Sequence, residues 1–269
     1  MNKKPTVVYL ISNYDEESNI FNFIKNYKRY KAGLKHDLII CFKNSYSKTF
    51  ENKIRKKIHP YPYKKFIDSG VNDFDWGSYT RVAKKNKNKI LFFFNCHSYP
   101  VKKNWLKFFS NHYKSKTILS PTGSFQSISS SSFTSFYFKN LFYRFYYGIL
   151  NIGNFPLFPN PHIRSNCFMI NSSDFLTLNL INCKTKIHTW INESGRKSMT
   201  NQLLKKKFRL LVINSENKNF FIPDWKKSET YAFKKQRKLL ISDKHTREYN
   251  SLTNKEKKIY EKNIWGSKF

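Results

Sequence analysis

The 269-residue sequence predicts an α/β fold with an open, mostly parallel, twisted sheet flanked by helices. Two continuous apolar runs, residues 37–42 and 89–94, are typical of parallel strands that are covered on both faces. Residues 6–42 follow the order strand, amphipathic helix, strand, which is the βαβ unit of a parallel sheet. We therefore expect one principal domain in which strands and helices alternate.

Apolar periodicity places the individual elements. The first helix, at about 16–31, has large apolar residues at helical spacing, and Gly33 follows it as a helix stop. Near the end of the chain, Thr253 and Glu256 have the spacing of a capping box and predict a last helix. The predicted strands are 6–12, 37–42, 89–94, 117–120, 166–170, 209–213 and 239–242, and a further helix is expected at 104–113.

The regular alternation stops after residue 125. Residues 127–135 are rich in serine and 136–158 are rich in aromatics. Four apolar residues of this stretch share one helical face: Phe138, Phe142, Phe145 and Ile149. That face fits either an amphipathic helix lying on a membrane surface or a helix packed on the core. We predict a domain at 1–224 with an aromatic-rich insertion at about 125–160, followed by a basic C-terminal extension at 225–269 that carries the last helix.

Composition narrows the function classes only partly. The formal charge of +33 would attract polyanions such as nucleic acid, anionic lipid or phosphorylated substrates. The same charge also fits a biased nucleotide composition, because Lys, Asn, Ile, Phe and Tyr are abundant together. The four cysteines form no CxxC pair, which argues against a zinc ribbon or a disulfide framework. No apolar stretch is long enough for a membrane span, so we expect a cytoplasmic protein that is soluble or peripheral to the membrane.

Polar residues gather at two places that a parallel sheet would bring to one edge. Residues 75–79 read Asp-Trp-Gly-Ser-Tyr and precede a helical run, which predicts a turn at Gly77 that opens the helix. Residues 95–97 read Asn-Cys-His and follow the strand at 89–94 directly. Open α/β sheets bind ligands outside the carboxyl ends of their strands. The sequence therefore predicts a substrate crevice between Gly77 and the tip that carries His97.

In this order and spacing, the motifs resemble the nucleotide-sugar half of GT-A glycosyltransferases over about residues 5–215. Within that superfamily the chain looks closest to rhamnan-synthesis-type and related family 2-like polysaccharide transferases, whose later His-x-x-Ser stretch corresponds to residues 162–165 here. The resemblance implies a hexosyltransferase-type enzyme that moves a sugar from a nucleotide-sugar donor to a polysaccharide or lipid-linked glycan acceptor. It further implies cell-envelope polysaccharide biosynthesis at the inner face of the membrane.

The resemblance also implies roles for particular residues. Inverting transfer needs a carboxylate that takes the proton of the acceptor hydroxyl. Glu193 is our candidate for this base, with Arg196 nearby to keep it ionised; a helix N-terminal acid paired with Arg196 is the structural alternative. The expected substrate-binding residues are Ser12, Asn13, Asp75, Gly77, Tyr79, Arg81, Asn95, Arg164 and Arg196.

One departure from the family pattern concerns the metal. GT-A enzymes commonly hold Mg²⁺ or Mn²⁺ with Asp-x-Asp, where this chain has Asn95, Cys96 and His97. Neutral amide and imidazole groups supply no negative charge to a hard cation, so this departure argues against strong dependence on Mn²⁺ or Mg²⁺. His97 is the candidate metal ligand, and Asn95 and His97 could instead cap the strand end. Without a metal, basic side chains would have to stabilise the diphosphate; the candidates are Arg81, Lys102, Lys103, Arg164 and Arg196.

Two other functions remain open at this point. The missing Asp-x-Asp fits a catalytically silent protein with a transferase fold. The positive charge and the interleaved aromatics fit a nucleic-acid-binding protein. No recognisable nucleic-acid-binding motif accompanies that charge, so we do not expect nucleic acid as a partner.

Overall fold

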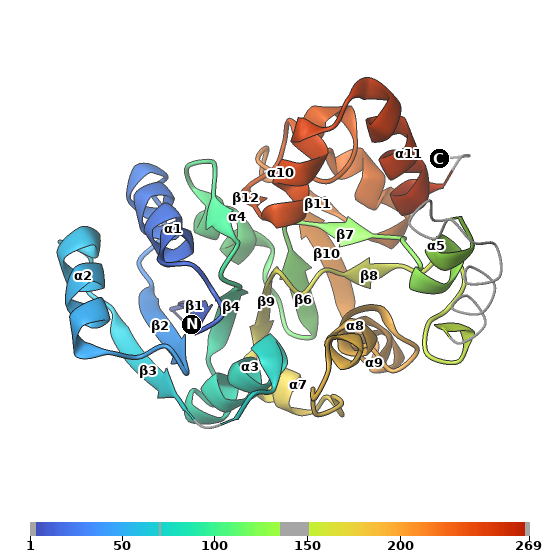
Figure 1. The fold of residues 1–269 in the computed structure, drawn as a ribbon. Coiled ribbons are helices and arrows are strands. Elements are labelled where there is room, and N and C mark those ends of the chain that lie inside the picture. Colours follow the sequence, from blue (N-terminus) through green and yellow to red (C-terminus); the bar gives the residue numbers. More distant parts are fainter. Residues whose placement is uncertain (1–3, 70, 135–150, 267–269) are drawn as a thin grey trace.

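The computed structural model describes residues 4–69, 71–134 and 151–266. Their central feature is an eight-stranded sheet with the strand order β11-β10-β6-β9-β4-β1-β2-β3 (Figure 1). Its strands are β1 (Thr6–Ser12), β2 (Asp37–Lys43), β3 (Lys64–Asp68), β4 (Ile90–Phe94), β6 (Thr117–Ser120), β9 (Cys167–Asn171), β10 (Arg209–Ile213) and β11 (Asn219–Phe220). Short two-stranded sheets join β5 (Tyr99–Pro100) to β12 (Ile241–Ser242) and β7 (Gly123–Ser124) to β8 (His162–Ile163).

Helices flank the large sheet and extend beyond it. The α-helices are α1 (Glu17–Arg29), α2 (Lys48–Ile58), α3 (Phe74–Lys85), α4 (Trp105–His112), α5 (Ile128–Thr134), α7 (Ser172–Leu176), α8 (Lys186–Ser194), α9 (Met199–Lys205), α10 (Lys244–Ser251) and α11 (Asn254–Trp265). Two 3₁₀ segments, η1 (Ile222–Ser228) and η2 (Lys234–Gln236), lie in the C-terminal part. Within the described residues, no helix has the length and apolar character needed to cross a bilayer.

The sheet is mostly parallel, as predicted. β1 pairs in parallel with β2 and β4, and β6 pairs in parallel with β10. β9 is the exception inside the sheet, because it runs antiparallel to both β4 and β6. The carboxyl ends of β1, β2, β4 and β6 therefore share one edge with the amino end of β9. This carboxyl edge carries the candidate site described below.

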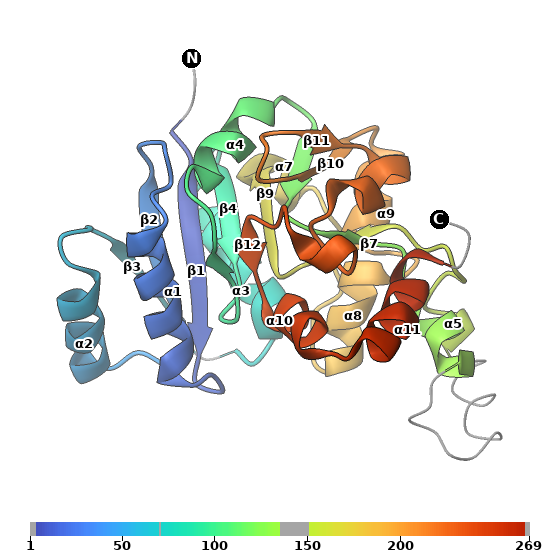
Figure 2. The ribbon, with the colours of Figure 1, turned by 90° about the horizontal axis from the view of Figure 1, so that it is seen from above.

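Both faces of the sheet are buried, which explains the continuous apolar strands. Along β1, Val7 and Tyr9 pack in one apolar cluster with α1, α2 and α4. The alternate residues Val8 and Leu10 pack in the other cluster with α3, α7 and α9. Figure 2 shows α1 lying beside β1 and β2, with α2 on the outer side of α1. A strand covered on both faces has no polar side, so its sequence does not alternate.

The predicted start of the third helix is wrong. We expected a turn at Gly77, but α3 begins at Phe74 and Gly77 lies inside it. A Cβ atom at Gly77 would lie 1.9 Å from the Asp73 carboxylate. The glycine therefore makes room for Asp73 and does not form a turn. Asp75 lies in the first turn of α3 and does not cap the helix.

The C-terminal part of the chain packs onto the rest of the molecule. Trp225, Tyr231 and Trp265 are buried in the same cluster as α3 and α9. The predicted capping box is confirmed, with the Thr253 and Glu256 side chains each bonded to the other's backbone N–H. The division at residue 224 stays a prediction. The aromatic face of Phe138, Phe142, Phe145 and Ile149 lies outside the described residues.

Candidate functional site

The loops after β1 and β4 meet the segment before β9 at the carboxyl edge. The backbone N–H of Asn95 donates to the Asn166 carbonyl at 3.0 Å, which ties the end of β4 to the start of β9. The Asn95 side chain accepts hydrogen bonds from the His97 N–H and the Ser98 hydroxyl. Asn95 thus shapes the strand end, as the structural alternative predicted, and its side chain also lines a pocket.

An acidic group that the sequence analysis overlooked lies in the loop after β1. Asp15 accepts hydrogen bonds from the Ser12 N–H at 2.7 Å and from its hydroxyl at 2.9 Å. Potential metal-binding atoms of Asp15, Cys96 and His97 all lie within 4.8 Å of one another. Ser12 therefore orients a carboxylate beside the predicted metal ligand His97. Asn13 is exposed, and its N–H donates to the Lys43 carbonyl.

The protonation states of this group limit what it can bind. Burial lowers the pKa of His97, so the imidazole is neutral at neutral pH. Burial and the Asp15 carboxylate raise the pKa of the Cys96 thiol, so it stays protonated. Asp15 and His97 therefore offer one oxygen and one nitrogen ligand, beside a thiol that a bound cation would have to deprotonate. This mixed donor set suits Mn²⁺ better than Mg²⁺, which prefers oxygen alone.

Asp75, from the first turn of α3, is a second carboxylate of this region. It makes no hydrogen bond or ion pair with any residue that the structure describes. Burial raises its pKa to about 7, and the nearby negative charges of Asp15 and Glu193 act in the same direction. Asp75 therefore changes its protonation near neutral pH. Asp15 and Glu193 both act electrostatically on Asp75, which indicates that the three carboxylates lie near one another.

Arg81 does not fit the predicted role of diphosphate ligand. Its guanidinium donates to Asp68 at 2.5 Å and to Asp73 at 2.6 Å. The buried Lys43 ammonium joins the same network, 2.5 Å from Asp73. Hydrogen bonds to Asp73 and Asp68 raise the pKa of Arg81. Its charge is therefore committed to fixing the start of α3.

The structure also contradicts the prediction that Tyr79 and Gly77 contact the substrate. Tyr79 is 1% exposed, and its ring centroid lies 4.5 Å from that of Phe93 in the core. Its side chain cannot reach a ligand at the carboxyl edge. Gly77 has the packing role described above, against Asp73.

Glu193 lies in the last turn of α8, neither in a loop nor at a helix N-terminus. Its carboxylate accepts a hydrogen bond from the Ser165 hydroxyl. Arg196 makes no ion pair with Glu193, because its Nε donates to the Ile152 carbonyl at 3.1 Å and its backbone N–H to Asn154. The prediction that Arg196 lies beside Glu193 and keeps it ionised is therefore wrong.

A pocket of about 430 Å³ brings together three predicted site residues, Asn95, Arg164 and Glu193. We call it the Glu193 pocket. The described residues that line it are Asn95, Ser124, Gln126, His162, Arg164, Ser165, Asn166, Glu193, Tyr231, His245, Glu248 and Tyr260. These residues come from both halves of the chain, so the C-terminal segment forms part of its wall.

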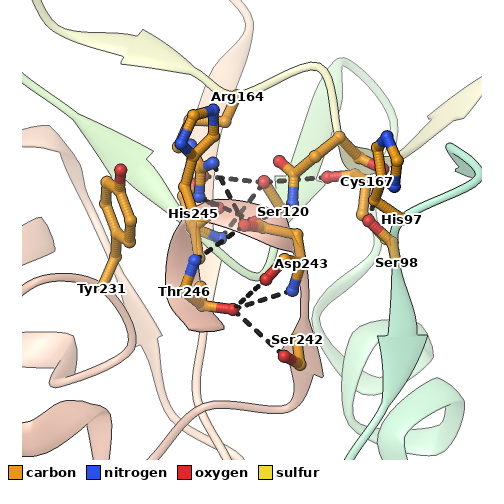
Figure 3. Close-up of polar contacts among 12 residues, drawn as sticks. His97, Ser98, Ser120, Arg164, Cys167, Tyr231, Ser242, Asp243, His245 and Thr246 are labelled. Carbon is orange, nitrogen blue, oxygen red and sulfur yellow. Dashed lines mark hydrogen bonds and ion pairs between the residues drawn. The ribbon is translucent and has the colours of Figure 1, made fainter. Parts of the chain in front are cut away.

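A buried ion pair joins this wall to the sheet. Arg164 donates to Asp243 at 2.8 Å and lies 4.1 Å from the centroid of the Tyr231 ring. Burial alone would raise the pKa of Asp243, but the Arg164 charge and a hydrogen bond from Thr246 hold that pKa below its usual value. Asp243 also caps α10 by accepting from the Thr246 N–H at 2.9 Å (Figure 3). Arg164 is thus held in place by a residue 79 positions further along the chain.

Two cations of α10 were missed by the sequence analysis. Arg247 donates to the His97 carbonyl at 3.0 Å, and Lys244 and Arg247 both act electrostatically on the His97 imidazole. The capping pattern of Asp243 and Thr246 was the sequence signal for this helix. That pattern does not reveal which other segment the helix lies against.

The chain is similar to known proteins in structure. No protein-family model and no curated protein matches the chain. Among solved structures, it is similar to the glycosyltransferase GlyE of Streptococcus pneumoniae TIGR4, with 10% identity, a TM-score of 0.44, and coverage of 77% of this chain and 45% of GlyE. It is also similar to the mannosyltransferase Ktr4p of S. cerevisiae, with 10% identity, a TM-score of 0.40, and coverage of 76% and 61%. Mouse xyloside xylosyltransferase 1 gives 8% identity, a TM-score of 0.41, and coverage of 78% and 85%.

The chain therefore spans about half of GlyE and about three fifths of Ktr4p. Similarities of this size concern the arrangement of helices and strands and carry no argument about activity.

Proposed function

We propose that this protein is a glycosyltransferase that uses a nucleotide-sugar donor and a hydroxyl of a polysaccharide or lipid-linked glycan as acceptor. The observation that carries the proposal is the set of three carboxylates, Asp15, Asp75 and Glu193, at the carboxyl edge of the sheet. None of them forms an ion pair with a described cation, although Lys and Arg outnumber Asp and Glu by 50 to 17. Unpaired carboxylates beside a pocket are suited to proton transfer and to binding sugar hydroxyls.

In the proposed reaction, the acceptor oxygen forms a bond to the anomeric carbon of the donor sugar. The bond from that carbon to the diphosphate oxygen breaks, and the nucleoside diphosphate leaves with the bonding electrons. The acceptor hydroxyl proton moves to the Glu193 carboxylate, which borders the Glu193 pocket. Ser165 holds Glu193 by donating to it, so the base keeps one orientation.

Asp75, Ser12 and Asn13 are proposed to contact the donor. With a pKa of about 7, Asp75 can act as hydrogen-bond donor or acceptor toward a sugar hydroxyl at neutral pH. Negative charge that develops on the leaving diphosphate needs cations nearby. Lys244 and Arg247 fit this role better than Arg81, since both act on His97 at the same edge.

Asp15 and His97 would hold a divalent cation, with Mn²⁺ favoured over Mg²⁺ by their donor atoms. When bound, such an ion would supply positive charge to the diphosphate. Because Asp15 and His97 supply a single negative charge between them, the lysine and arginine of α10 remain necessary in this proposal.

Donor binding is the first test. UDP-, GDP- and dTDP-sugars are added to the full-length protein, with and without Mn²⁺, and the melting temperature is measured. A ligand that binds only the folded state raises that temperature. We expect at least one sugar nucleotide to do so. If none does and no transfer or donor hydrolysis is detected, the proposal is wrong.

The second test concerns the base. Glu193→Gln keeps the size of the side chain and its bond with Ser165, but it removes the proton acceptor. We expect transfer to fall by about 10²- to 10⁴-fold, while the donor-induced shift in melting temperature is retained. Glu216→Gln, at a glutamate 42% exposed and outside the Glu193 pocket, is the matched control. Wild-type transfer rates in Glu193→Gln would remove Glu193 from the mechanism.

A further inference from the structure

The lining of the Glu193 pocket differs in charge from the rest of this strongly basic chain. Among the residues that the structure describes, this lining contains one arginine, two glutamates and no lysine. The arginine, Arg164, is already neutralised by Asp243, which is buried directly behind it. The described part of the pocket lining therefore presents no unpaired arginine or lysine to a ligand, in a protein whose net charge is +33.

The other polar groups of the pocket strengthen this contrast. Burial lowers the pKa of His162, so its ring is neutral at neutral pH. The Glu248 carboxylate lies 3.0 Å from the His245 ring nitrogen. An anionic ligand would lose its hydration shell here without meeting an unpaired arginine or lysine among the described lining residues, because Arg164 is paired with Asp243. The cations Lys244 and Arg247 act on His97 and are not part of this lining.

Neutral hydroxyl groups, by contrast, find partners throughout the pocket. Amide, hydroxyl and carboxylate groups line it, and they can accept or donate hydrogen bonds to a polyol. Tyr231 and Tyr260 add aromatic surface with polar tips, and their hydroxyl oxygens are 3.1 Å apart. The volume of about 430 Å³ lies in the range of small-ligand sites.

We propose that the Glu193 pocket binds an uncharged sugar unit of the acceptor and discriminates against acidic sugars and sugar phosphates. That the bound sugar is an acceptor rests on the proposed function, whereas the binding of the sugar does not require catalysis. The carboxylate Glu248 is the specificity-determining residue, because its charge repels an anionic substituent at the rim. Glu193 lies in the same pocket and would receive the proton of the bound hydroxyl.

The test compares methyl glycosides that differ only at C6. Methyl glucoside, methyl glucuronide and methyl glucoside 6-phosphate form one set, and the galacto and manno sets are treated alike. Binding to the full-length protein is measured by calorimetry and by saturation-transfer NMR, alone and with UDP or GDP present. We expect at least one neutral glycoside to bind with a dissociation constant at least tenfold lower than its acidic counterparts.

A charge variant makes the test specific to the pocket. Glu248→Lys should raise the affinity for the glucuronide and the 6-phosphate several-fold and leave the neutral glycoside within about threefold. Asp224→Lys makes a similar change at a comparable exposure, 45% against 48%, outside the pocket lining. It should change none of these affinities. Because both side chains are exposed, neither variant should prevent folding.

The proposal is overturned if the acidic glycosides bind wild type as well as the neutral ones, or if no glycoside binds under any condition. An equal response of the two lysine variants would overturn the role of Glu248. These failures are distinct from failure of the proposed function. If neutral glycosides bind but sugar nucleotides do not, the pocket binds sugars and the transferase proposal is wrong. If the protein transfers sugar to acidic acceptors alone, it is a transferase and the proposed specificity is wrong.

Discussion

Two groups of acidic residues lie near the carboxyl edge of the sheet, and they differ in what neutralises them. Asp68 and Asp73 are buried and are bonded to Arg81 and Lys43. Asp15, Asp75 and Glu193 have no such cation among the residues described. The first group is a closed ion network, whereas in the second group Glu193 lines the Glu193 pocket and Asp15 lies beside Cys96 and His97.

This difference separates a structural use of charge from a chemical one. In the ion network, each carboxylate is held by two cations, so burial does not leave an uncompensated charge. Asp75 lies two residues from Asp73, yet burial raises the pKa of Asp75 to about 7 and the cations hold that of Asp73 down despite its burial. The ion network fixes the start of α3 and with it the position of Asp75 in the first turn of that helix.

The largest difference between the two groups of acidic residues should appear when the buried ammonium of Lys43 is removed. Lys43→Met leaves Asp68 and Asp73 with Arg81 alone, and loss of one partner of a buried ion pair costs about 3–5 kcal/mol. We expect the free energy of unfolding, measured by urea denaturation, to fall by about this amount. The control is Lys53→Met, which removes a surface pair with Glu17 at 3.1 Å whose lysine is 51% exposed. A pair of this kind contributes about 0–1 kcal/mol, so equal losses in the two variants would contradict the assignment.

A smaller loss of stability is expected from substitution of Gly77, which leaves room for the Asp73 side chain. Gly77→Ala places a Cβ atom 1.9 Å from that carboxylate, and relieving the overlap must displace Asp73 from its cations. We expect a loss of about 2–3 kcal/mol in the free energy of unfolding, in the range of overpacked sites. At Gly153 an added Cβ meets nothing within 4 Å, so Gly153→Ala should change stability little. If Gly77→Ala is as stable as Gly153→Ala, Asp73 does not depend on this close approach.

The sequence was sufficient for those features that depend on neighbours along the chain. The apolar run at 37–42 predicted β2, and the spacing of Thr253 and Glu256 predicted the start of α11, because both signals are local. Gly77 shows the limit of local rules. A glycine before a helical run usually indicates a turn, and only the position of the Asp73 carboxylate reveals its actual role.

The candidate site was predictable only in part for a related reason. Asn95, Arg164 and Glu193 were identified and do meet at one pocket. Their partners were not identified, because Asp243 lies 79 positions from Arg164 and Asp15 meets His97 only when β1 and β4 are paired. Pairings between distant segments arise from the fold, and a single sequence contains no periodicity that encodes them.

The third variant, Asp75→Asn, tests the unpaired carboxylate through the pH dependence of stability. Asp75 has a higher pKa in the folded protein, about 7, than its ordinary value of 3.8, so the folded state binds more protons between these pH values. Stability should therefore fall as pH rises through this window, by about 2 kcal/mol after allowance for solvent screening. Asp75→Asn removes the titration, so its free energy of unfolding should exceed that of wild type at pH 8 and approach the wild-type value near pH 4.

Activity provides the opposite readout for the same variant. If Asp75 contacts the donor, Asp75→Asn should raise KM for the sugar nucleotide while the protein becomes more stable at pH 8. The matched comparison is Asp73→Asn, which should lose stability at both pH values because it leaves Lys43 and Arg81 with fewer partners. Opposite signs for two aspartates two residues apart would establish that the pairing of each carboxylate, and not its position in the sequence, decides its role. If both variants lose stability at pH 8, Asp75 has a stabilising partner in the folded protein, and its assignment to the crevice is wrong.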